Sequence, residues 1–217
     1  IAYALRQLGH EVHCMPEEDK RHRPNYSNWL MDAATRADLL LFHKWQDDKT
    51  LRRIIEQNPK LKRVFWYFDL VSWPGDPTLK GRSVTRINWM NTFVPLVDLG
   101  FCTDGDFVLN DPTRKLVWLP QGADERIVGK GTRREGVVAK PILFTGIVRN
   151  AGEERGRWFR GLQERYAGQI THYTNGMYRE ELRDCIASHM IVVAPDSPVT
   201  SWYWSNRVWN ALGFGAF

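Results

Sequence analysis

Residues 141–150 read Pro-Ile-Leu-Phe-Thr-Gly-Ile-Val-Arg-Asn, a short apolar run that ends in threonine and glycine. A continuous apolar run of this length is typical of a strand that is buried on both faces of a parallel sheet. Helical spacing follows over 153–167, where Trp158, Phe159 and Leu162 fall on one face. The succession of strand, glycine and helix therefore predicts a parallel sheet covered by helices.

The same alternation continues on both sides of this unit. Toward the C-terminus we expect strands over 169–173 and 190–194, helices over 178–188 and 205–212, and the start of one more strand at 215–217. Toward the N-terminus we expect helices over 1–9, 26–37, 47–58 and 87–94, and strands over 11–15, 38–43, 63–69, 99–103 and 116–119. Residues 122–137 hold four glycines and no apolar periodicity, which is typical of a linker.

The predicted fold class is α/β with two Rossmann-like parallel-sheet domains. The first domain covers 1–122, a linker covers 123–137, and the second domain covers 138–217. The chain opens on a helix and closes as a strand begins, so we expect the arrangement to be truncated at both ends, without its first strand and its last helices.

Composition is that of an ordinary globular protein, with 43% hydrophobic and 25% charged residues. No apolar run approaches the roughly 18 residues of a membrane span, and no signal-peptide pattern is present, so a cytoplasmic location is expected. Cys14, Cys102 and Cys185 lie far apart in apolar stretches, which predicts reduced core cysteines. After residue 124 arginine outnumbers lysine 11 to 2, which favours recognition of phosphate or carboxylate groups.

Ligands of open parallel sheets bind beyond the carboxyl ends of the strands. In the second half these ends carry Gly146 to Asn150, Thr174 to Tyr178 and Pro195 to Arg207. A glycine lets the backbone approach a phosphate, and the N-terminus of the following helix favours an anion. Three arginines early in that helix either reach such a phosphate or face water: Arg155, Arg157 and Arg160.

Residues 201–217 read Ser-Trp-Tyr-Trp-Ser-Asn-Arg-Val-Trp-Asn-Ala-Leu-Gly-Phe-Gly-Ala-Phe. This segment resembles the C-terminal donor-binding segment of GT-B glycosyltransferases, in particular the group similar to the spore-maturation glycosyltransferases. That group has a Ser-Asn-Arg-like start, an aromatic residue, a glutamate and a short helix that closes on Gly-x-Gly-x-Phe. Less distinctive similarity extends over most of the chain, at 65–70, 98–106, 120–124 and 142–146.

The resemblance implies a glycosyltransferase whose two nucleotide-fold domains face each other across a cleft. The second domain would bind a nucleotide-sugar donor, and the first an acceptor that is a saccharide, a protein or a small molecule. No divalent metal, nucleic-acid partner or membrane span is expected. The strand ends and the resemblance together suggest ten donor-binding residues: Gly146, Arg149, Asn150, Arg157, Thr174, Tyr178, Ser205, Asn206, Arg207 and Asn210.

The chemistry of the final segment agrees with a donor site. Ser205 or Asn206 can cap a helix whose N-terminus faces the cleft, and Arg207 adds a charge where a diphosphate would lie. Asn210 stands where the family has a glutamate that bonds the donor ribose. An amide also bonds a hydroxyl, but without the charge assistance of a carboxylate. Leu212 is expected to turn toward the sheet.

Candidate catalytic groups follow strands of the first half: His43, Asp69 and Asp104. An imidazole can act as a general base, although His43 also suits a strand end where a neighbouring group satisfies it. Asp69 follows four aromatic residues and is either a base or a partner of a nearby N–H. Asp104 either caps the next helix or faces the acceptor. With Asp106 it also matches the metal-holding Asp-x-Asp of GT-A glycosyltransferases, which have one nucleotide sheet rather than two.

Two other functions stay open. A nucleic-acid-binding protein would need a contiguous basic stripe, whereas acidic residues interleave with the arginines here. A nucleotide-dependent oxidoreductase would need Gly-x-Gly-x-x-Gly after a strand, and the sequence contains no such run.

Overall fold

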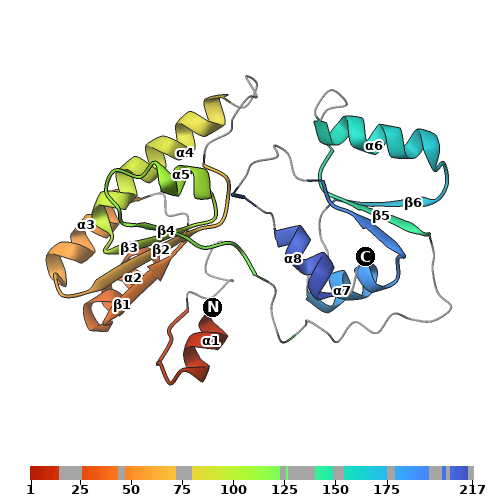
Figure 1. Cartoon of the computed structure of the whole chain (residues 1–217). Coiled ribbons are helices and arrows are strands. Elements are labelled where there is room, and N and C mark those ends of the chain that lie inside the picture. Colours follow the sequence, from red (N-terminus) through yellow and green to blue (C-terminus); the bar gives the residue numbers. More distant parts are fainter. Residues whose placement is uncertain are drawn as a thin grey trace. The chain divides into compact units, whose positions relative to one another are not determined.

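A computed structural model of the chain describes residues 1–14, 26–43, 47–71, 80–122, 126, 140–148, 154–174, 179–195, 202–203 and 206–214. They form helices and two parallel sheets (Figure 1): one sheet has four strands in the order β1-β2-β3-β4, and the other has three in the order β6-β5-β7. The sheets share no strand, so the predicted α/β class with two separate parallel sheets is confirmed. Across these residues, no helix is long and apolar enough to cross a membrane.

The first sheet consists of β1 (Leu39–Phe42), β2 (Lys62–Tyr67), β3 (Leu99–Cys102) and β4 (Leu116–Trp118). The helices in this part of the chain are α1 (Ala2–Gln7), α2 (Tyr26–Arg36), α3 (Asp48–Gln57), α4 (Lys80–Phe93) and α5 (Gly105–Leu109), with a 3-10 turn at Val94–Leu96. β1 and β2 pair in parallel, from Leu39 opposite Lys62 to Phe42 opposite Phe65.

Helix α3 begins after an N-cap residue, Asp47. The carboxylate of Asp47 accepts hydrogen bonds from the N–H groups of Lys49 and Thr50, at 3.1 and 3.3 Å. Leu51 and Ile54, which follow at helical spacing, are buried in the core. The cap and the apolar stripe therefore fix both the start of α3 and the face that it buries.

The core of the first sheet packs aromatic rings against a glycine. Phe65 on β2 is fully buried, and its ring lies 5.9 Å from that of Trp89 in an edge-to-face arrangement. A Cβ atom at Gly100 on β3 would lie 2.3 Å from Cε1 of Phe65 and 2.7 Å from Cδ2 of Leu116. Only glycine lets β3 pass between these two buried side chains.

The second sheet is built around its first strand. Its elements are β5 (Ile142–Thr145), α6 (Glu154–Arg165), β6 (Ile170–Tyr173), α7 (Arg179–Ala187), β7 (Ile191–Val193) and α8 (Asn206–Gly213). Ile142 at the start of β5 is paired in parallel with Ile170 on one side and with Ile191 on the other. All four residues of β5 are buried, as predicted for a strand covered on both faces.

Alternate residues of β5 face different helices. Phe144 contacts Phe159 of α6, with ring centroids 4.8 Å apart. Leu143 clusters instead with Ile186 of α7 and with Phe214, which follows α8. Helix α6 therefore covers one face of β5, while α7 and the end of α8 cover the other.

Two apolar residues expected on buried faces are exposed. Leu212 is 63% exposed, because Phe214, just beyond α8, takes the place beside Leu143. Trp158 is 59% exposed, because the next residue, Phe159, is the one that faces β5. The helices were predicted correctly in these cases, but the residues that each would bury were partly wrong.

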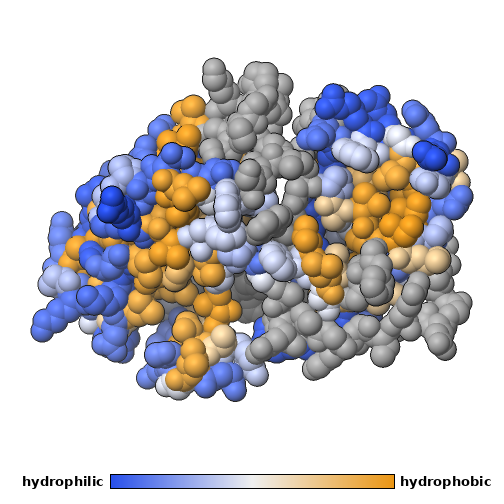
Figure 2. Space-filling model, viewed as in Figure 1, coloured by the Kyte–Doolittle hydropathy of each residue, from blue (hydrophilic) through white to orange (hydrophobic). Residues whose placement is uncertain are grey.

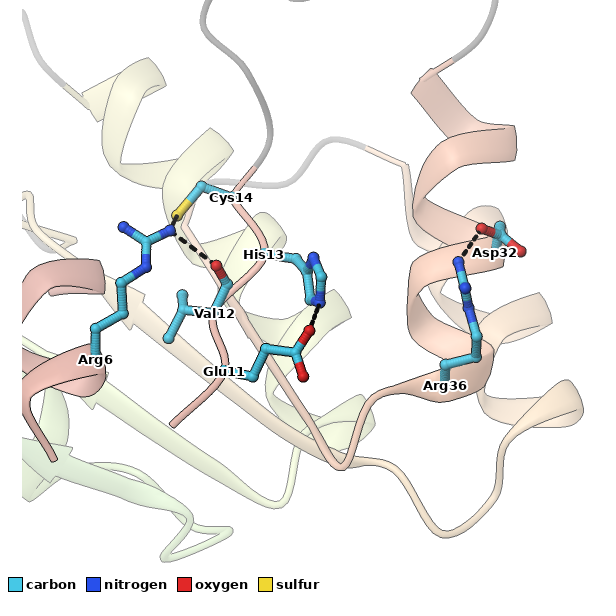
Figure 3. A network of polar contacts seen from close by, with 7 residues as sticks. All are labelled: Arg6, Glu11, Val12, His13, Cys14, Asp32 and Arg36. Atoms are coloured by element: carbon cyan, nitrogen blue, oxygen red, sulfur yellow. Dashed lines mark hydrogen bonds and ion pairs between the residues drawn. The ribbon is translucent and has the colours of Figure 1, made fainter. Parts of the chain in front are cut away.

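The strand expected at 11–15 is not formed by residues 11–14, and Met15 lies outside the described residues. Instead, the carbonyl of Val12 accepts a hydrogen bond from Arg6 at 2.8 Å, and His13 contacts Glu11 at 2.9 Å (Figure 3). Helix α1, which carries Arg6, buries no residue. Local side-chain contacts thus replace the pairing that a strand would need.

The three cysteines are free, but only one is fully buried. Cys14 is exposed, with its Sγ 3.9 Å from Nη2 of Arg6 (Figure 3), so its prediction as a core residue was wrong. Cys102 is buried, and burial raises the pKa of its thiol to about 12. Cys185 is half-buried, and burial together with the charge of Glu181 raises its pKa.

Internal contacts divide the chain into two compact units. One unit comprises Ile1–Tyr67, Ile87–Phe101 and Asp111–Val117, and the other comprises Phe68–Arg86, Cys102–Asn110 and Trp118–Phe217. The linker expected at 123–137 lies almost wholly outside the described residues. Domain boundaries at 122 and 138 therefore stay a prediction.

We predict that Gly100→Ala destabilises the protein by about 1–3 kcal/mol, the usual cost of overpacking a filled core. The matched control is Gly161→Ala in α6, where an added Cβ would meet nothing within 4 Å. That change should stabilise the helix by about 0.5–1 kcal/mol, because alanine has the higher helix propensity. Urea unfolding of both variants measures the difference, and an unchanged midpoint for Gly100→Ala would contradict this account of the core.

Candidate functional site at the edge of the second sheet

The strand order β6-β5-β7 marks the carboxyl ends of β5 and β7 as the edge of the second sheet where a ligand is expected. The strands that follow β5 in sequence lie on opposite sides of it, so the chain changes direction across the sheet between β5 and β7. In open parallel sheets, such a reversal leaves a crevice outside the carboxyl ends of the two strands. Here that edge carries Thr145 and Gly146 at the end of β5, and Ala194 and Pro195 after β7.

Gly146 has a backbone conformation that side chains rarely adopt, with φ at +130°. Its N–H donates to the carbonyl of Tyr173 at 2.9 Å, and its own carbonyl accepts from Nε2 of His172 at 2.9 Å. A Cβ atom here would lie 3.3 Å from Cδ of Arg155. Both the φ angle and the close side chain explain why glycine follows β5.

Arg155, in the first turn of α6, bridges the segments that follow β5 and β7. Its Nε donates to the carbonyl of Pro195 at 3.2 Å, and its Nη1 donates to the carbonyl of Ile147 at 3.4 Å. These carbonyls lie beyond the ends of β7 and β5, respectively. A guanidinium group therefore joins the ends of the two strands beside which ligands of such sheets bind.

Thr145 contributes a buried hydroxyl to the same edge. The residue is 4% exposed, and its Oγ1 has no hydrogen-bond partner among the described residues. Leaving a buried hydroxyl without a partner costs about 1–3 kcal/mol. Since side chains alternate along β5, Thr145 shares a face with Leu143, whereas Phe144 faces α6.

Helix α8 carries two of the predicted donor-binding residues. Arg207 and Asn210 are three residues apart, so they share a helix face, and both are half-buried. The N–H of Phe214 donates to the carbonyl of Asn210 at 2.9 Å, and its ring packs in the cluster around Leu143. The end of α8 is thus anchored on the face of β5 that also carries Thr145.

Of the other predicted donor-binding residues, the structure describes three: Arg157, Thr174 and Asn206. Arg157 is exposed and lines a shallow depression of about 520 Å³, which is formed by residues of α6 together with Tyr166 just after it. Figure 2 shows hydrophilic side chains over this helix. Thr174 is exposed after β6, and Asn206 is the first residue of α8. Four predicted residues lie outside the described part of the chain: Arg149, Asn150, Tyr178 and Ser205.

In the first sheet, His43 follows β1 and is exposed. Its Nδ1 lies 2.8 Å from the carbonyl of Trp66. A carbonyl can only accept, so Nδ1 carries the proton in the neutral ring and Nε2 carries the lone pair. The strand-end hydrogen bond anticipated from the sequence is present, and it fixes the tautomer that a base at Nε2 requires.

Asp104 caps helix α5 and also binds the backbone at Val71. It is fully buried, and its carboxylate accepts hydrogen bonds from the N–H groups of Phe107 at 3.1 Å and Val71 at 2.9 Å. The first bond caps α5, as expected, and the burial leaves no exposed oxygen for an acceptor. Asp69 is half-buried nearby, and its carbonyl accepts from the hydroxyl of Thr103 at 3.4 Å.

The same hydrogen bonds bear on the Asp-x-Asp pattern. Each carboxylate oxygen of Asp104 already has an N–H donor, which would repel a cation, while Asp106 is half-buried in the first turn of α5. Within the described ranges, no three histidine, cysteine, aspartate or glutamate side chains are grouped to hold a metal ion. Its role as a helix cap accounts for Asp104. Gly105, between the two aspartates, packs against Trp202, because a Cβ atom added to Gly105 would lie 2.5 Å from the Cβ of Trp202.

Known proteins give no further guide to this edge. No protein-family model matches the chain, and a search of curated proteins finds no match either. The chemistry of the site itself therefore has to carry any functional conclusion.

We predict that Asp104→Asn destabilises the protein by about 1–3 kcal/mol, because an amide nitrogen would face one of two buried N–H donors. Asp106→Asn should change stability by no more than about 0.5 kcal/mol, as is usual for a site without buried partners. Urea unfolding measures both. If the two aspartates instead shared a divalent cation, calorimetry would show that the parent chain binds Mn²⁺ and that each variant binds it more weakly. We expect neither result.

Proposed function

We propose that the chain is a GT-B-like glycosyltransferase that moves a sugar from a nucleotide-sugar donor to an acceptor. The observation that supports this best is Gly146, held at a φ of +130° beside Arg155 at the edge where β5 and β7 end. Parallel sheets bind the phosphates of nucleotides at such an edge. The resemblance of residues 201–217 to a donor-binding segment points to the same class of ligand.

In this proposal, the donor diphosphate lies between the end of β5 and α8. Arg207 pairs with the diphosphate, and Asn210 bonds a ribose hydroxyl from the same helix face. The acceptor oxygen forms a bond to the anomeric carbon, and the bond from that carbon to the diphosphate oxygen breaks. The guanidinium of Arg207 and the helix N-termini neutralise the departing diphosphate, so no divalent metal is required.

The proton of the acceptor hydroxyl needs a base. His43 and Asp69 stay candidates: the neutral His43 ring has its lone pair on Nε2, and Asp69 is half-buried after β2. Asp104 is no longer one, because its buried carboxylate already accepts two backbone hydrogen bonds. The acceptor class, whether saccharide, protein or small molecule, is left to assay.

We predict that Arg207→Ala weakens binding of nucleoside diphosphates by about 1.5–3 kcal/mol, the range for a hydrogen bond between charged groups. Binding of the bare nucleoside should change far less, because it lacks the phosphates. Calorimetric titrations of both ligands, run with a chelator present, measure the difference. Arg53→Ala, an exposed arginine of α3, is the matched control and should bind both ligands as the parent does.

The outcomes separate the proposal from its rivals. Equal losses for the two ligands would mean that Arg207 holds the fold rather than the phosphate, and no loss for either would remove residues 201–217 from the site. Binding that requires Mn²⁺ would contradict the metal-independent mechanism. Tight binding of a pyridine dinucleotide or an oligonucleotide, without any nucleotide sugar bound, would instead favour an oxidoreductase or a nucleic-acid-binding protein.

A further inference from the structure

Two consecutive peptide groups after β5 have their carbonyls tied back by side chains. The carbonyl of Gly146 accepts from Nε2 of His172 at 2.9 Å. The carbonyl of Ile147 accepts from Nη1 of Arg155 at 3.4 Å. His172 belongs to β6 and Arg155 to α6, so two different elements hold these two carbonyl groups.

Fixing a carbonyl also fixes the N–H of the same peptide group. In a trans peptide the N–H points opposite to the C=O. The N–H of Ile147 therefore points away from His172, and the N–H of Val148 points away from the guanidinium of Arg155. Within the described residues, neither N–H donates a hydrogen bond. Both residues are half-buried, so these donors are partly shielded from water.

A second observation concerns a buried hydroxyl at this edge. The hydroxyl of Thr145, directly before Gly146, is buried without a partner among the described residues. Successive backbone N–H groups with a neighbouring hydroxyl form a common type of phosphate-binding concavity. An anion here would accept hydrogen bonds from donors that have no partner among the described residues.

We propose that the N–H groups of Ile147 and Val148 bind a phosphate group, and that His172 and Arg155 are positioning residues that orient these donors through the two peptide planes. The inference rests on the proposed function only for the source of the phosphate, which would be the donor diphosphate. His172 is well suited to the role. Its ring packs 4.3 Å from that of Phe159 and 5.6 Å from that of Phe144, so its Nε2 is held in place.

The test compares two substitutions of His172, with inorganic pyrophosphate as the probe. His172→Phe keeps a ring against Phe159 but loses the donor to Gly146. It should weaken pyrophosphate binding about tenfold, the order expected when one oriented donor to a charged group is lost. His172→Gln keeps an N–H donor and should stay within about threefold of the parent. Gln169→Ala, exposed before β6, is the control and should bind as the parent does.

Backbone amide NMR of the parent chain gives a second test that needs no variant to fold. Pyrophosphate should shift the amide protons of Ile147 and Val148 downfield, as a new hydrogen bond to an anion does. Equal affinity for parent and His172→Phe, equal losses in both His172 variants, unshifted amides, or no pyrophosphate binding to the parent would each overturn the inference. If one of these results is found but nucleoside diphosphates still bind, the phosphate-binding role of the Ile147 and Val148 N–H groups is wrong and the proposed function stands. If nucleoside diphosphates do not bind either, the proposed function fails as well.

Discussion

The candidate site depends on how the peptide at Gly146 is held. Its N–H donates to the carbonyl of Tyr173, and its carbonyl accepts from Nε2 of His172. The side chain of Arg155 lies against the place where a Cβ would be. These contacts keep φ at +130°, a conformation that only glycine adopts without strain. They also decide the direction in which the chain leaves β5. The end of β6, the first turn of α6 and Pro195, two residues after β7, consequently meet at one edge of the sheet.

Local signals in the sequence were enough to predict most of the fold. A continuous apolar run predicted β5, and the helix expected over 47–58 is present as α3. The errors occur where distant packing decides. A helix period does not say whether Trp158 or its neighbour Phe159 faces the sheet, nor that Phe214 would replace Leu212 in the core. Residues 11–14 alternate like a strand, but a strand also needs a neighbour to pair with, and Arg6 supplies the hydrogen bond to this segment instead.

The place of the candidate site followed from the rule that ligands bind at strand ends, but its residues followed only in part. Arg155 lies four residues before Phe159 and shares its inward face, whereas Arg157 is exposed; the phase of α6 relative to Phe159 could have distinguished them. His172 carried no local signal. Its importance arises from the register that sets it opposite Phe144, which a single sequence does not reveal. Asp104 showed the opposite problem, since a helix cap and a catalytic carboxylate look alike in sequence.

The central claim is that the edge of the second sheet where β5 and β7 end binds the phosphates of a nucleotide. A crystal structure of the chain grown with a nucleoside diphosphate tests it most directly, because phosphate groups are the strongest scatterers of such a ligand. The account predicts the diphosphate beside Gly146, within hydrogen-bond distance of the N–H groups of Ile147 and Val148, and on the α8 side of β5. A nucleotide bound anywhere else, with Gly146 and Thr145 untouched, would contradict it.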